Sequence, residues 1–295
     1  MKLPDGLNVK KTKTILAIDV GTSAIKAVVW DAALGRPVAA RSADNDSNVA
    51  GLPRGHHEQD PLRILARCRE TMLGVLLDPA VVPSGVTAIA ISGQMHGVLL
   101  VDRRLKPVTN LITWRDRRTA DAPLPAGAAA RTGCAPHPGY GGVTLGWLAS
   151  HGSLPGDVTA LSIAGFLAAT LTGTAAMEPT HAASWGIMNL RDGGWDGDLI
   201  AALGIPASVL PGIRPSSCPL APLLPECARE LGLPADTLVC SPIGDAQAAV
   251  FAVAGSTDDT AILNLGTGGQ LSVITKDFAV VDGLETRPMP PDAHL

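Results

Sequence analysis

The sequence predicts an α/β fold in which helices cover a mixed β-sheet. Short apolar runs bounded by turn residues alternate with helical stretches along the first hundred residues. Some of these runs follow one another directly, as the strands of hairpins do, so we expect both parallel and antiparallel pairing. The composition, with 46% hydrophobic and 17% charged residues among 295, is that of a globular protein.

The elements of the first part of the chain are predicted mainly as strands. Strands are expected at 14–18, 25–30, 37–41, 86–91, 98–101 and 111–114. A helix is expected to begin at Asp60-Pro61 and to run to about Leu77, because proline fits the first turn of a helix.

The second part of the chain is predicted to be more helical. Helices are expected at 118–131, 143–151, 163–172 and 196–203. Residues 205–225 are rich in proline, which predicts an extended connection and a domain linker. A strand at 238–242, a helix at 245–254 and strands at 261–265 and 270–274 follow.

Composition argues against several classes of partner and site. The net charge is −4 and aromatic residues make up only 3%, so we expect no nucleic-acid partner. The longest apolar segment, 86–101, contains Gln94 and His96 and is too short and polar to span a membrane. The five cysteines form no CxxC pair, which predicts free thiols rather than a zinc site. Without a leader-like apolar segment, a cytoplasmic protein is expected.

The stretch ILAIDVGTSAIKAVVWD, residues 15–31, carries the first sign of chemistry. An apolar strand ends in Asp19 and is followed by the small-residue turn Gly21-Thr22-Ser23. This turn offers backbone N–H groups and hydroxyls, which are the groups that bind phosphate. Asp19 is placed to hold a hydrated magnesium ion beside such phosphates. A plain hairpin turn is the alternative.

A second stretch, ILNLGTGG at 262–269, repeats the pattern of a strand that runs into Gly-Thr. Two such hairpins predict two related lobes, each of which offers a turn to the same ligand, although the repeat is short. Together with Asp19 and Lys26, the second turn favours phosphate binding over a plain hairpin.

Two further motifs follow predicted strands. SGQMHG, residues 92–97, places Gln94 and His96 at a strand end, where side chains commonly face a ligand, here a polyol. A loop with a satisfied histidine is the alternative. IGDAQA, residues 243–248, places Asp245 at the start of a helix. An ordinary helix cap and a catalytic base are equally compatible with that position.

These motifs occur, in this order, in the FGGY carbohydrate kinases, which the chain resembles over nearly its whole length. WRD at 114–116 belongs to the same ordered set. The stretches AASWGIMNL at 182–190 and GDAQAAVFA at 244–252 are most similar to the sedoheptulokinases of this family. Xylulokinases are similar but favour Asn where Ala246 stands and Asp where His181 stands. A further departure is Arg117, where glycine is common.

The resemblance implies the actin-like ATPase fold, which is ribonuclease H-like in each of two lobes, with ATP and sugar between them. It implies that residues 1–241 form the N-terminal lobe and 242–295 the beginning of a second lobe, so we expect a truncated kinase. The implied cofactors are ATP and Mg²⁺. The implied partner is a small ketose substrate. The resemblance leaves both a monomer and a homodimer as alternatives.

The resemblance also implies the roles of individual residues. Asp19 would orient the magnesium ion through water, and Asp245 would be the base that takes a proton from the primary hydroxyl of the substrate. Phosphate contacts are implied for Gly21, Thr22, Ser23 and Lys26 and, from the opposing turn, for Gly266, Thr267 and Gly268. Substrate contacts are implied for Gln94, Met95, His96, Asp116 and Asp245.

The implied reaction is phosphorylation of a ketose such as sedoheptulose to its 7-phosphate. A xylulokinase or other pentulose kinase is the nearest alternative. A sugar-binding pseudokinase is a different class, as is an actin-like structural module. The last of these lacks a loop like SGQMHG, which argues against it.

Overall fold

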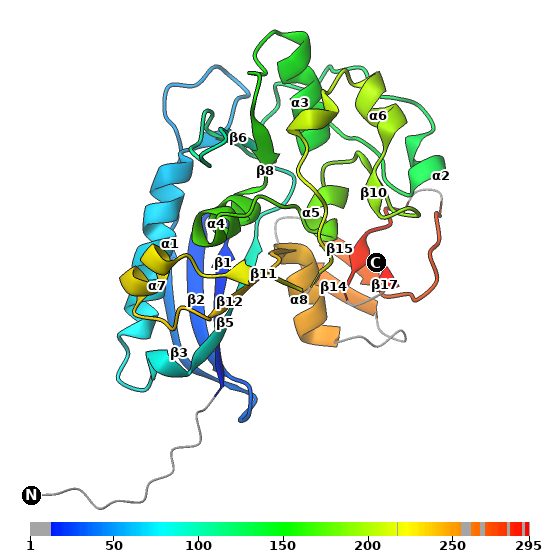
Figure 1. Ribbon diagram of the computed structural model, residues 1–295. Coiled ribbons are helices and arrows are strands. Elements are labelled where there is room, and N and C mark those ends of the chain that lie inside the picture. Colours follow the sequence, from blue (N-terminus) through cyan, green and yellow to red (C-terminus); the bar gives the residue numbers. More distant parts are fainter. Residues whose placement is uncertain are drawn as a thin grey trace, which may run out of the picture.

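A seven-stranded mixed sheet forms the centre of the molecule (Figure 1). The computed structural model describes residues 13–216, 218–254, 261–265, 269–281, 284–290 and 293–294. The strand order is β11-β12-β5-β1-β2-β3, and β13 pairs with β5 beyond the end of β12. The strands are β1 (Thr14–Val20), β2 (Ala24–Asp31), β3 (Arg36–Asp44), β5 (Val86–Gly93), β11 (Pro219–Pro222), β12 (Leu238–Cys240) and β13 (Ile243–Gly244).

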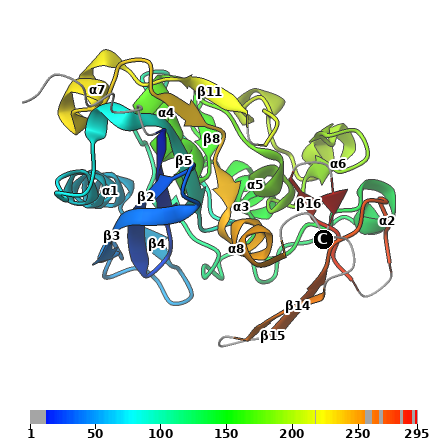
Figure 2. The same cartoon turned by 90° about the horizontal axis from the view of Figure 1, so that it is seen from below.

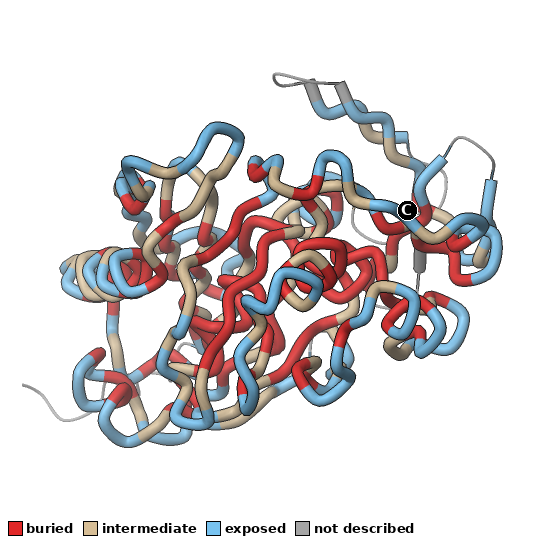
Figure 3. Tube along the Cα trace, turned by 90° about the horizontal axis from the view of Figure 1, so that it is seen from above, coloured by how far each residue is buried: buried red, intermediate tan, exposed pale blue. Residues whose placement is uncertain are grey.

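Pairing within this sheet is mixed, as the sequence predicts. β5 runs parallel to β1, β12 and β13, whereas β2, β3 and β11 are antiparallel to their neighbours. Burial alternates along β1 and β2, so one face of the hairpin is apolar and closed. Figure 3 shows that buried positions gather along these inner segments of the molecule.

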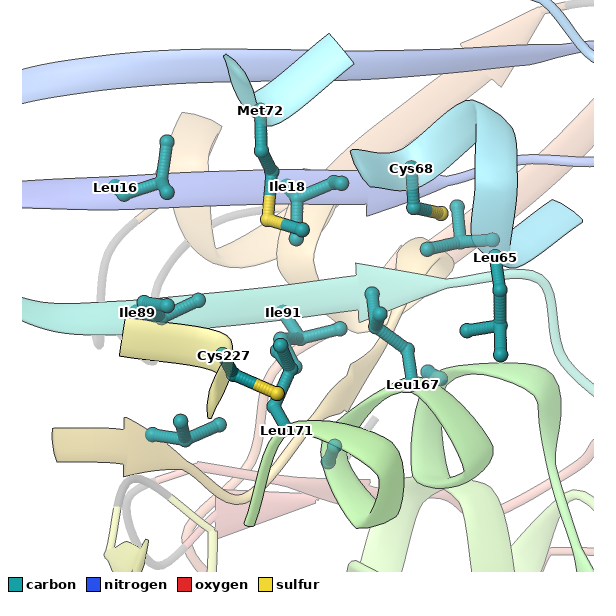
Figure 4. Close-up of a cluster of buried hydrophobic side chains, with 14 of the residues drawn as sticks. Leu16, Ile18, Leu65, Cys68, Met72, Ile89, Ile91, Leu167, Leu171 and Cys227 are labelled. Carbon is teal, nitrogen blue, oxygen red and sulfur yellow. The ribbon is translucent and has the colours of Figure 1, made fainter. Parts of the chain in front are cut away.

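Three helices cover the closed face of the sheet. They are α1 (Pro61–Leu76), α4 (Ile163–Thr172) and α7 (Pro225–Leu231). Asp60 caps α1 by accepting hydrogen bonds from the N–H groups of Leu62 and Arg63, at 2.8 and 3.3 Å. Figure 4 shows side chains of these helices packed against β1 and β5. The helix α8 (Asp245–Ala254) lies on the other side of the sheet from α1 (Figure 2).

A second apolar core lies beside the sheet and surrounds the buried Trp185. It includes residues of α2 (Ala128–Thr132), α3 (Gly141–Ser150), α5 (Pro179–Ala183), α6 (Gly197–Ala202), β6 (Leu99–Val101) and β8 (Thr159–Leu161). The short remaining elements are β4 (Glu58–Gln59), η1 (Pro83–Gly85), β7 (Leu111–Ile112), β9 (Met188–Asn189), β10 (Gly194–Trp195), η2 (Ala207–Val209), β14 (Ala261–Leu265), β15 (Gly269–Val273), β16 (Pro288–Met289) and β17 (Ala293–His294).

Two predictions about local structure are wrong. Residues 118–127 are turns and loop, and only Ala128–Thr132 of the expected helix is helical. Pro123 and Pro125 lack the N–H that an inner helical turn needs. The proline-rich 205–225 is also not simply a linker, because Pro219–Pro222 is an edge strand of the main sheet. Proline has no N–H to donate to a neighbouring strand, and a strand at the edge of a sheet has a neighbour on one side only.

Two further expectations concern free cysteine thiols and the absence of a membrane-spanning segment. All five cysteines are free, and Cys68, Cys134 and Cys227 are buried. Within the described ranges, no helix combines the length and the apolar character needed to cross a bilayer.

Candidate active site

Three parallel strands end side by side and bring the polar motifs together. Ser92 of β5 lies between Asp19 of β1 and Ile243 of β13 in the sheet register. The hydroxyl of Ser92 donates a hydrogen bond of 2.8 Å to Oδ1 of Asp19. Asp245 comes two residues after Ile243. Ligands of open α/β sheets bind at the carboxyl ends of the strands, so this edge is the candidate active site.

The turn that joins β1 and β2 is tight and well anchored. The Gly21 N–H donates to the carbonyl of Ala24 at 3.0 Å, and Asn45 Nδ2 donates to the carbonyl of Gly21 at 2.9 Å. A Cβ at position 21 would lie 2.8 Å from the Ala24 carbonyl oxygen, so the turn requires glycine there. The structure therefore holds a small-residue turn beside Asp19, as a phosphate-binding loop needs.

The side chains of this turn differ in their surroundings. Thr22 Oγ1 donates to Gln94 Oε1 at 2.9 Å and accepts from Trp114 Nε1 at 3.0 Å. Ser23 is exposed. Lys26 is exposed too and pairs directly with Asp19 across the β1–β2 ladder, so both side chains lie on one face. Phosphate contacts by these residues stay predictions.

Gln94 links the turn to a residue that the sequence did not single out. Its Nε2 donates to Gln59 Oε1 at 2.9 Å, and Gln59 Nε2 donates to the backbone carbonyl of Thr22 at 3.0 Å. The buried amide of Gln94 thus bridges Thr22 and Gln59. Its predicted contact with the sugar stays a prediction, and the structure assigns it this bridging role as well.

His96 presents one ring nitrogen as a hydrogen-bond acceptor. Its backbone φ is +69°, and its Nδ1 lies 2.8 Å from the carbonyl oxygen of Ser184. A carbonyl oxygen can only accept, so Nδ1 carries the proton and Nε2 has the lone pair. The ring stacks on Tyr140, with centroids 4.3 Å apart. Burial, and then the nearby charge of Arg287, lowers the pKa of His96 to about 4, so it is neutral at physiological pH.

Asp116 is more deeply engaged with the protein than the sequence indicated. Its Oδ1 accepts from Arg118 Nε at 2.8 Å, and its Oδ2 accepts from Arg118 Nη2 at 2.9 Å and from the His57 N–H at 2.7 Å. Burial raises the pKa of Asp116, but these hydrogen bonds outweigh it and hold the pKa below its usual range. A contact with the sugar stays a prediction, whereas a buried ion pair with Arg118 is observed.

Asp245 has the environment of a general base. It is the first residue of α8, is partly buried, and accepts a 2.8 Å hydrogen bond from the Ala246 N–H. Burial and the negative charge of Asp19 together raise the pKa of Asp245 to about 6, against the lowering effect of the hydrogen bond from Ala246. A base with a pKa just below neutrality is ionised and still able to take a proton.

The loop of SGQMHG packs against the strand that carries Asp245. Met95 is buried, and a Cβ on Gly244 would lie 2.7 Å from Met95 Sδ. The same Cβ would lie 2.9 Å from Gln247 Oε1. The SGQMHG loop and the Asp245 segment are therefore in contact, and a larger residue at position 244 would require the Met95 and Gln247 side chains to shift.

Two side chains at this contact have unpaired buried atoms. Gln247 Oε1 and both ring nitrogens of His181 lack a hydrogen-bond partner among the described residues. Burial lowers the pKa of His181 to about 4, so its ring is neutral. Buried polar atoms are rarely left unpaired. Gln247 lies two residues after Asp245 on α8, and His181 lies on α5, so both belong to the packing around the Asp245 segment.

The carboxylate of Asp19 suits a hydrated magnesium ion. No cluster of three or more His, Cys, Asp or Glu that could enclose a metal occurs in the part of the chain that the structure describes. Magnesium beside nucleotide phosphates usually takes only one or two carboxylates and keeps several waters. A single Asp19 beside the 20–24 turn fits that pattern.

The second predicted phosphate turn cannot be compared with the first. Gly266, Thr267 and Gly268 lie outside the described residues. The strands on either side form the expected antiparallel hairpin, in which Leu265 pairs with Gly269.

This arrangement of sheet and strand-end motifs is that of the sugar kinases with an actin-like ATPase fold. Residues 14–252 match the N-terminal domain of the FGGY family of carbohydrate kinases. The chain belongs to this family, which confirms the resemblance and the fold class inferred from the sequence.

Individual relatives differ in what they phosphorylate. The chain is 30% identical to sedoheptulokinase of Mus musculus over 286 residues. The matched region covers 87% of this chain and 58% of that protein. It is 32% identical over 232 residues to glycerol kinase of Trichlorobacter lovleyi, covering 69% and 44%. A ligand-bound xylulose kinase structure from Lactobacillus acidophilus superposes with a TM-score of 0.84 at 26% identity, over 95% of this chain and 58% of that one. The chain thus spans about half the length of such relatives.

Proposed function

We propose that this chain supplies the sugar-binding lobe and the catalytic base of an ATP-dependent ketose kinase, with sedoheptulose as the preferred substrate. The observation that carries the proposal is the meeting of Asp19, the 20–24 turn and Asp245 at the ends of parallel strands. Within this proposal, residues 1–241 form the N-terminal lobe and 242–295 begin the second.

The reaction follows from these positions. Asp245 takes the proton of the primary hydroxyl while the hydroxyl oxygen attacks the γ-phosphorus of ATP. The bond from that phosphorus to the bridging oxygen breaks, and ADP leaves. Magnesium, held by Asp19 through water, would supply charge neutralisation on the phosphates. Positioning and charge neutralisation dominate phosphoryl transfer, so Asp19 and the turn contribute more than the base.

Several side chains on the proposed sugar side of the site are neutral. His96 is neutral and offers a lone pair on Nε2, and His181 and Gln247 carry unpaired polar atoms. Neutral donors and acceptors suit the hydroxyl groups of a ketose. The similarity to a sedoheptulokinase over 87% of the chain supports a seven-carbon ketose, with xylulose as the alternative.

The experiment that tests this function is a substrate panel. The chain, alone and joined to the second lobe of a related kinase, is mixed with ATP, Mg²⁺ and either sedoheptulose, xylulose or glycerol, and ADP release is measured. Sedoheptulose is expected to give the highest kcat/KM. Calorimetry with each sugar separates binding from phosphorylation. Failure of sedoheptulose, xylulose and glycerol alike to bind or react would overturn the proposal.

Replacing His96 with alanine is expected to weaken sugar binding and to spare nucleotide binding. The change removes the Nε2 acceptor and the stacking on Tyr140. Loss of one neutral hydrogen bond costs about 0.5–1.5 kcal/mol, and more where the partner stays unpaired. The affinity for the ketose, measured by calorimetry, should fall by roughly 2- to 12-fold or more. The control is His151→Ala, because His151 stacks on Trp147 at a surface position. Equal affinities in both variants would contradict the role of His96.

A further inference from the structure

A threonine far from Asp245 in the sequence holds the strand that carries this residue. Thr180 lies in α5 and is fully buried. Its hydroxyl oxygen accepts a 2.7 Å hydrogen bond from the backbone N–H of Gly244, the residue before Asp245. The same hydroxyl donates its proton to Oε2 of Glu178. A hydroxyl has one proton, so the direction of both hydrogen bonds is fixed.

Glu178 accepts the proton of the Thr180 hydroxyl. It caps α5, is buried, and its Oε2 also accepts from the Thr180 N–H at 2.7 Å. Its Oε1 accepts from the hydroxyl of Ser216. The backbone N–H of Gly244 can only donate, so the hydroxyl oxygen of Thr180 accepts from Gly244 and its single proton points to Glu178. A helix cap needs only the backbone contacts, so the bond to Gly244 is an additional feature.

The Gly244 segment has little other support from the sheet. β13 is two residues long, and its ladder with β5 consists of Ile243↔Ser92 and Gly244↔Gly93. The backbone at Gly244 is also packed closely, as the Met95 contact shows. A shift of this backbone would move both Asp245 and the SGQMHG loop.

We propose that Thr180, oriented by Glu178, is a positioning residue that fixes Gly244 and thereby places the Asp245 carboxylate relative to Asp19. Its importance for catalysis rests on the proposed function, in which Asp245 is the base. The hydrogen-bond chain itself does not depend on that function and can be tested without turnover.

The test uses the full chain, labelled for NMR, in four forms: wild type, Thr180→Val, Thr180→Ser and Thr172→Val. Thr172 is a matched control, because its buried hydroxyl in α4 also donates one hydrogen bond and accepts another. It donates to the carbonyl of Ala168 and accepts from the backbone N–H of Thr174 at 3.1 Å. Thr180→Val should speed amide exchange at Gly244 by about tenfold or more relative to wild type, because a buried N–H loses its acceptor. The carboxyl carbon signal of Asp245, recorded at pH 8, should shift. Thr180→Ser should restore both readings, and Thr172→Val should change neither.

Several results would overturn the proposal. One is an unchanged Gly244 exchange rate in Thr180→Val. Another is altered exchange with an unchanged Asp245 signal, which would leave Thr180 as a purely structural residue. A third is a Thr180→Ser variant that behaves like Thr180→Val. If Thr180→Val does not fold, Thr180→Ala removes the same hydroxyl without adding a buried methyl group and is judged by the same readings. Asp245→Asn in the kinase assay tests the base separately, so the two failures are distinguishable.

Discussion

Replacing Asp245 with asparagine is expected to lower the turnover of ketose phosphorylation by roughly 100-fold or more, the usual magnitude for a general base. Asparagine keeps the size of the side chain and can still accept the Ala246 N–H, but it cannot take a proton. The affinity for the ketose should change much less than turnover. The measurement is ADP release under saturating ATP and sugar, in the form of the protein that is active in the substrate panel.

The pH dependence of the wild type gives an independent reading of the same residue. Burial raises the pKa of Asp245 to about 6, and a base acts only when ionised. Activity should therefore persist above pH 6 and fall as the pH drops below 6, and this acid limb should be absent in the residual activity of Asp245→Asn. Asp198→Asn is the control, since Asp198 also lies in the first turn of a helix but is exposed. Turnover of Asp245→Asn within a few-fold of wild type would remove Asp245 from the role of base.

Local sequence patterns predicted the elements that form the sheet and the site. The run 163–172 and the helix 245–254 have the predicted bounds, because their apolar content and flanking turn residues are local properties. The helix expected at 118–131 does not form over residues 118–127, because Pro123 and Pro125 are incompatible with an inner helical turn. The sequence alone contained the signal against this helix. The sequence predicted a linker where Pro219–Pro222 forms an edge strand, because proline is rare in strands. The strand forms all the same, because an edge position tolerates proline.

The site was predictable where a motif lies at or directly after the end of a strand. Asp19 is one of the last two residues of β1, SGQMHG begins at the end of β5 and Asp245 follows β13, and the structure brings them to one edge of the sheet. The side chains that hold this edge were not predictable in the same way. Gln94 and Gln59 are 35 residues apart, and Thr180 and Gly244 are 64 apart. No local pattern pairs such residues, because their contact arises only when distant elements pack together.

The buried ion cluster of Arg118, Asp116 and Glu58 is expected to be costly to disrupt from one side. Arg118 donates to Asp116 at 2.8 Å and to Glu58 at 2.5 Å, and its side chain is 7% exposed while that of Asp116 is 2% exposed. Arg118→Met keeps much of the apolar stem but leaves both carboxylates without their cation. Breaking such a pair from one side costs about 3–5 kcal/mol, because a buried charge is left uncompensated. The free energy of unfolding, measured with urea, should fall by this amount.

A surface ion pair provides the control for Arg118→Met. Arg103 and Asp157 are as close, at 2.7 Å, but their side chains are 80% and 74% exposed. Water solvates the remaining partner there, so Arg103→Met should cost no more than about 1 kcal/mol. In Arg118→Met, the guanidinium no longer lowers the pKa of Asp116 against burial, so this pKa should rise relative to wild type. The double variant Asp116→Asn with Arg118→Met should therefore recover part of the lost stability. If Arg118→Met costs no more than Arg103→Met, the cluster does not stabilise this part of the fold.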